Sequence, residues 1–74
     1  MTIREIMDET EEIIQKKRYP ESVATTAWGT IYSLREDPKE AMKVLELAKN
    51  STSARELVKN LQPIRNKYLK RNLQ

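Results

Sequence analysis

Residues 22–34 read SVATTAWGTIYSL and contain no Asp, Glu, Lys or Arg, although 34% of the 74-residue chain is charged. The stretch also holds the only tryptophan, Trp28, and the only glycine, Gly29. Its apolar residues recur two per helical turn, which predicts a helix. They are Val23, Ala24, Ala27, Trp28, Ile31 and Tyr32. Because a helix without a charged face is normally covered on most sides, we expect it to be the most enclosed helix of a small bundle, with Trp28 and Tyr32 in the core.

One helix is predicted before this stretch and another after it. Thr2 and Glu5 have the spacing of a capping box, and apolar residues follow at i, i+3, i+4 and i+7, which predicts a helix over residues 2–18. Pro20 ends it, so the central helix covers residues 20–34. Asp37 followed by Pro38 is a strong helix start and predicts a third helix, the shortest, over residues 38–49.

The last helix is predicted over residues 53–72, with Ser53 and Glu56 at capping spacing. Pro63 lies inside it and removes one backbone hydrogen bond. The helix is therefore kinked there, or a short fifth helix begins; the unbroken apolar phase favours the kink. Together these segments predict an all-α fold, a single helical domain over residues 1–74 built as a small antiparallel bundle of four helices. Gly29 in a helix interior suggests that a neighbouring backbone approaches closely.

Composition argues against several classes of function. The chain has no His and no Cys, so the commonest general base, the strongest nucleophile and the usual zinc ligands are absent. Asp8 or Glu9 with Glu12 resembles a carboxylate pair, but a solvated acidic face is the simpler interpretation. One glycine cannot form a phosphate-binding loop. We expect no enzyme, no cofactor and no metal site, and no small-molecule ligand is evident.

The basic C-terminal segment is the clearest functional signal. Residues 53–74 hold six basic residues and one acidic residue, a net charge of +5. A charged stripe on this helix could contact phosphates, or it could simply be the solvated face of a bundle. The candidate partner-binding residues are Arg55, Lys59, Lys67, Lys70 and Arg71.

The opposite end of the chain is acidic, since residues 1–15 hold five acidic residues and one basic residue, a net charge of −4. A dipolar surface suits a protein partner or self-association at least as well as a polyanion. A face of small residues on the central helix is either covered by the other helices or exposed as a contact surface. Its residues are Ser22, Thr26, Gly29, Thr30 and Ser33.

These observations predict a non-enzymatic protein-interaction module, a regulator or inhibitor that acts by binding a macromolecular partner. The alternative is a nucleic-acid-binding protein that uses the last helix for phosphate contacts. The uncharged stretch is too short to span a membrane, and the first residues lack the pattern of a signal peptide. We therefore expect a cytoplasmic location.

Overall fold

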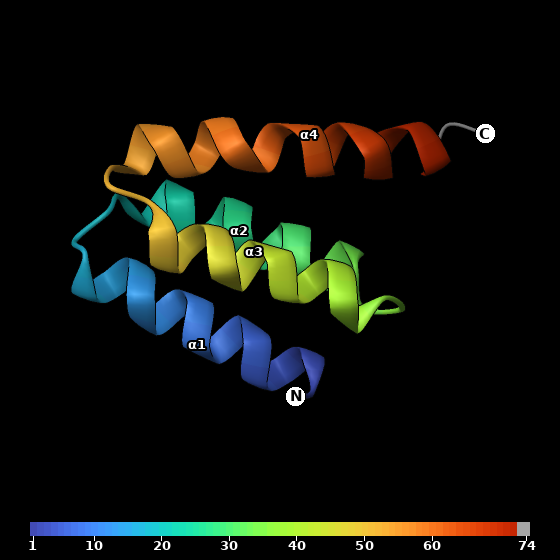
Figure 1. Ribbon diagram of the computed structural model, residues 1–74, viewed down its shortest axis with the longest axis horizontal. Helices are drawn as coiled ribbons and strands as arrows, with labels where there is room; N and C mark the ends of the chain where they lie inside the picture. Colours follow the sequence, from blue (N-terminus) through green and yellow to red (C-terminus); the bar gives the residue numbers. More distant parts are fainter. Residues whose placement is uncertain (73–74) are drawn as a thin grey trace.

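The computed structural model describes the backbone of residues 1–72 and the side chains of residues 1–67. It contains four helices, each running opposite in direction to the one before (Figure 1). Their bounds are Ile3–Lys16 for α1, Glu21–Ser33 for α2, Pro38–Asn50 for α3 and Ala54–Asn72 for α4. The predicted all-α antiparallel bundle of four helices is confirmed. The third helix is not the shortest, because α2 and α3 both have 13 residues.

The helices are arranged with α2 and α3 in the middle, α1 on one side and α4 on the other (Figure 1). Within the described residues, α1 and α4 do not touch, whereas α2 and α3 each contact all three other helices. The radius of gyration is 11.4 Å, close to the roughly 11 Å expected for a folded chain of this length. Two helices, and not α2 alone, therefore form the centre of the bundle.

The helix starts follow the local signals in the sequence. The Glu5 amide donates to Thr2 Oγ1 at 3.1 Å, and the Thr2 amide donates to Glu5 Oε1 at 3.0 Å, which completes the capping box of α1. Asp37 caps α3 by accepting a hydrogen bond from the Glu40 amide at 3.3 Å. Each cap satisfies an amide that the helix itself leaves without a partner.

Helix α4 runs unbroken through Pro63, so within the described residues no separate fifth helix begins there (Figure 1). Ser53 Oγ accepts a hydrogen bond from the Glu56 amide at 3.1 Å at the start of this helix. Pro63 cannot donate to the carbonyl of Lys59, and both residues are exposed. Water can therefore solvate that carbonyl, which explains why the helix continues.

The core consists of one buried stripe from each helix. Three fully buried alanines, Ala27, Ala41 and Ala48, carry side chains small enough for helices to approach closely. Thr10 is also buried, and its hydroxyl donates to the Ile6 carbonyl at 2.7 Å. The buried apolar residues are Ile6, Met7, Ile14, Val23, Ala27, Ile31, Leu34, Ala41, Val44, Leu45, Ala48, Leu57 and Leu61.

Helix α1 ends in a left-handed turn at Arg18, which has a φ of 58°. The Arg18 amide donates to the Gln15 carbonyl and the Tyr19 amide donates to the Ile14 carbonyl, both within about 3 Å. This pair of hydrogen bonds is the Schellman arrangement that satisfies the last carbonyls of a helix. A residue other than glycine in this conformation costs about 1 kcal/mol.

Lys17, the last residue before this turn, ties α1 to the end of α3. Its ammonium group donates to three backbone carbonyls at 2.7–2.9 Å, those of Ala48, Lys49 and Ser51. The Tyr19 hydroxyl lies 2.9 Å from Ser51 Oγ and completes the cluster. A cation at a helix C-terminus also interacts favourably with the helix dipole. The link joins the α1–α2 and α3–α4 connections at one end of the bundle.

Replacement of Lys17 tests this link. We expect Lys17→Met to lower the free energy of unfolding by about 2 kcal/mol, because three carbonyls lose a charged donor. Chemical denaturation followed by circular dichroism gives this value. Lys16→Met is the matched control: Lys16 pairs with Glu12 at 3.2 Å on the surface, and its loss should change stability by about 0.5 kcal/mol or less. Equal effects of the two substitutions would contradict the assigned role of Lys17.

Candidate functional site

The predicted basic residues lie on α4, along the edge of the bundle farthest from α1. Arg55, Lys59 and Lys67 are exposed. The side chains of Lys70 and Arg71 lie outside the described residues. The acidic residues of α1 occupy the other edge, because α1 and α4 flank the central pair of helices (Figure 1). The charge separation predicted along the chain thus becomes a separation across the molecule.

The prediction that Trp28 and Tyr32 belong to the core is wrong. Trp28 is 46% exposed and Tyr32 is 53% exposed, whereas Ala27 and Ile31, their neighbours in sequence, are fully buried. Adjacent residues on a helix point about 100° apart, so two apolar stripes run along α2. The other helices cover only the stripe that contains Val23, Ala27 and Ile31. The stripe that contains the two aromatic residues faces outward.

The exposed side of α2 carries no charge apart from Glu21 at its first residue. We call the exposed residues of α2 that follow Glu21 the Trp28 face. They are Ser22, Thr25, Trp28, Gly29 and Tyr32. An uncharged exposed surface with two large aromatic side chains is unusual for a monomeric protein and is typical of a contact surface.

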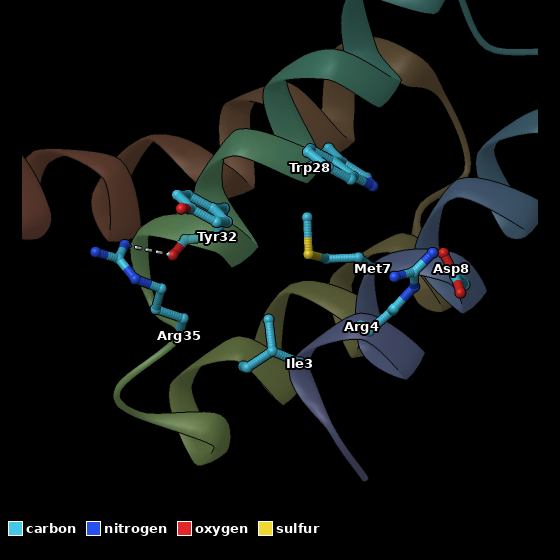
Figure 2. A pocket seen from close by; sticks show the side chains of 7 residues that line it. All are labelled: Ile3, Arg4, Met7, Asp8, Trp28, Tyr32 and Arg35. Atoms are coloured by element: carbon cyan, nitrogen blue, oxygen red, sulfur yellow. Dashed lines mark hydrogen bonds between the residues drawn. The ribbon is translucent and has the colours of Figure 1, made fainter.

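A hollow of about 470 Å³ lies beside Trp28 and Tyr32, between the first half of α1 and the second half of α2. We call it the arginine hollow, since two arginines line it. Figure 2 shows the Met7 side chain directed toward Trp28, with Arg4 and Asp8 beside each other on α1. Its lining residues are Ile3, Arg4, Met7, Asp8, Trp28, Tyr32 and Arg35.

Arg35 is held against one wall of this hollow. Its guanidinium lies 4.7 Å from the centre of the Tyr32 ring, a cation–π contact, and Arg35 Nη1 donates to the Tyr32 carbonyl at 3.1 Å (Figure 2). Because these contacts hold the side chain in place, less conformational entropy is lost when a partner binds there.

A second hollow of about 390 Å³ lies on the other side of Trp28. We call it the glutamate hollow, because Glu11 of α1 and Glu21 of α2 line it. Its other lining residues are Ala24, Thr25, Trp28 and Gly29. The indole of Trp28 therefore forms a ridge between two hollows, one with arginines and one with glutamates.

The expectation that Gly29 allows a close approach of another backbone is also wrong. A Cβ atom built at Gly29 would meet nothing within 4 Å. The predicted face of small residues does not form one surface either: Thr30 is buried, Thr26 and Ser33 are half-buried, and Ser22 and Gly29 are exposed. The hydroxyl of Thr30 donates to the Thr26 carbonyl within its own helix, at 2.7 Å.

The two carboxyls with lowered pKa values lie outside both hollows. Hydrogen bonds from the Thr2 backbone and side chain lower the pKa of Glu5. A hydrogen bond from Lys43 lowers the pKa of Glu40, and the charge of Lys67 on α4 adds to this effect. Both shifts stabilise the ionised form of a surface carboxylate. They reflect helix capping and ion pairing and do not indicate acid–base chemistry.

A third hollow of about 360 Å³ lies between α3 and α4, where Met42, Leu47 and Ile64 meet the stems of Lys39 and Lys43. None of the described residues that line it is aromatic. The Trp28 face and its two hollows are therefore the surface best suited to binding a macromolecule.

Comparison with known proteins finds no matching family model, no matching curated protein and no matching solved structure. No helix in the described part of the chain is long and apolar enough to cross a membrane. The cytoplasmic location stays a prediction.

Proposed function

We propose that this protein is a non-catalytic interaction module that regulates or inhibits a protein partner by binding it through the Trp28 face and the adjoining hollows. The observation that carries the proposal is the half-exposed Trp28, which stands on the uncharged outward face of α2 between two hollows with charged residues in their lining. Trp, Tyr and Arg are the residues most enriched among those that dominate the energy of protein interfaces. The second half of α2 and the turn that follows it supply one of each: Trp28, Tyr32 and Arg35.

The energy available from Trp28 alone is substantial. At 46% exposure its side chain leaves about 100 Å² for a partner to cover, which corresponds to about 2.5 kcal/mol at 25 cal/mol per Å². The apolar floor of the arginine hollow is extended by Met7, which is buried, and by Ile3, which is half-buried. A charged rim around an apolar centre is the usual arrangement of a stable protein interface.

Side-by-side capture from source lysate tests the proposal. We expect the wild-type chain to retain a defined protein at moderate salt, and Trp28→Ala and Tyr32→Ala to lose it while keeping their helical circular dichroism. Lys59→Ala, on the opposite side of the bundle, is the control and should retain it. The captured protein must then form a complex of fixed stoichiometry with the purified chain. Recovery of nucleic acid alone, or equal capture by all four baits, would refute the proposal.

A second candidate function is nucleic-acid binding through α4, and the exposure of Arg55, Lys59 and Lys67 supports it. No set of side chains suited to reading bases is evident, so the contacts would be with phosphates and largely independent of sequence. The acidic α1 lies on the far edge, where it would not oppose an approach from the α4 side.

Fluorescence anisotropy with a labelled duplex tests this second function. The expected result is binding at about 50 mM salt that weakens steeply as salt rises, and that Lys59→Glu weakens further by removing one phosphate contact. Trp28→Ala should leave it unchanged. Absence of binding at about 50 mM salt would exclude nucleic acid as the partner of α4.

A further inference from the structure

We propose that a second copy of this chain occupies the Trp28 face, related to the first by a two-fold axis that lies in the plane of the contact, passes over Trp28 outside α2 and runs at right angles to the helices. In this dimer α1 lies over α1 and α2 over α2, each pair antiparallel. The proposal rests on the assignment of this face as the binding surface and specifies its occupant.

The charges around Trp28 are arranged as such a two-fold axis requires. Glu21 lies seven residues before Trp28 and Arg35 lies seven residues after it, one beside each hollow. Rotation about the axis exchanges the two ends of α2 and places Glu21 opposite Arg35 of the other copy. This contact occurs twice, because an isologous interface repeats every pair.

Helix α1 repeats the same pattern. Glu11 lines the glutamate hollow and Arg4 lines the arginine hollow, so the rotation places Glu11 near Arg4 of the other copy. Asp8 is the exception, since it is acidic and lines the arginine hollow. It lies beside Arg4, one helical turn away, and that arginine offsets its charge (Figure 2). On α2 the centre of the contact is the uncharged Trp28 face. On α1 the rotation brings Asp8 near Asp8 of the other copy, and this is the one pair of like charges close to the axis.

Gly29 provides an independent argument. A glycine inside a helix costs about 1 kcal/mol relative to alanine, and nothing in the chain itself occupies the space beside it. Gly29 also lines the glutamate hollow next to Trp28. Close approach of another molecule at this point explains the glycine, and the ridge formed by Trp28 fits beside it when the second copy is rotated.

The surface required is compatible with the size of the protein. A standard interface covers about 800 Å² on each partner, which is about 15% of the 5273 Å² surface of this chain. The outward faces of two of the four helices contribute to the contact. We expect a dissociation constant in the micromolar range, because the centre is small and the charged pairs lie at its rim.

Charge reversal with the purified chain alone tests the arrangement. Glu21→Arg gives a chain with a basic residue at both ends of the contact, and Arg35→Glu gives one with an acidic residue at both ends. Each single variant should dimerise at least tenfold more weakly than wild type, since both pairs become repulsive. An equimolar mixture of the two variants should form a heterodimer, because both pairs are then attractive.

The measurement is sedimentation equilibrium from about 5 to about 500 μM, a range that brackets a micromolar dissociation constant. The expected mass of wild type and of the mixture rises toward twice 8.7 kDa, whereas for each variant alone and for Trp28→Ala the same rise requires at least tenfold higher concentrations. Lys59→Glu, a charge reversal on α4, is the matched control and should dimerise like wild type. Circular dichroism confirms that every variant is folded.

Three results would overturn the dimer: a wild-type mass of 8.7 kDa throughout the range, single variants that dimerise as tightly as wild type, or a mixture that dimerises no more tightly than the variants alone. None of these outcomes bears on capture of a different protein by the same face. Failure of the dimer and failure of the proposed function are therefore distinguished by separate experiments.

Discussion

The structure depends on one constraint: neighbouring helices cover only one stripe of each helix and leave the rest exposed. Because α1 and α4 do not touch within the described residues, α2 and α3 must close the core between them. Alanines at the buried positions of α2 and α3 let the helices approach closely, and one stripe of Ile, Leu and Val on each helix fills the remaining space. Within the described residues, no further element lies over the outer side of α2. The lack of charge on that side is therefore a property of the surface and not of the core.

This arrangement links the fold to the candidate site. The antiparallel pairing of α1 with α2 places the start of α1 beside the end of α2, so that Arg4 and Arg35 line one hollow. The same pairing places Glu11 beside Glu21 at the other hollow. At the end of the bundle where α1 finishes, Lys17 holds the connection to α2 against the last carbonyls of α3.

Local signals in the sequence were sufficient to predict the fold. Thr2 with Glu5, and Asp37 with Pro38, form the helix starts that their types and spacing indicate. The unbroken apolar phase across Pro63 correctly favours one helix, because the proline lies on the solvent side. The long-range link from Lys17 to Ser51 was beyond prediction, since it depends on which loops meet at one end of the bundle.

The candidate site was not predicted, for a related reason. Trp28 and Tyr32 have helical spacing with the core residues, and hydrophobicity alone assigns all of them to one buried surface. Their angular position separates them: Tyr32 lies nearly opposite the stripe formed by Val23, Ala27 and Ile31. A helical wheel places Tyr32 on the outward side of α2, so this part of the outward stripe is encoded in the sequence. The exposed positions of Arg55, Lys59 and Lys67 match the sequence-based interpretation, but whether they bind a partner depends on chemistry outside the chain.

The fluorescence of Trp28 tests the central claim most directly, because it is the only tryptophan and reports on one position. At a protein concentration low enough for the chain to be monomeric, the emission maximum should lie close to that of indole in water, and acrylamide should quench it efficiently. A blue-shifted emission that acrylamide does not quench, from a folded monomer, would mean that the outer side of α2 is covered, and it would contradict the account given above.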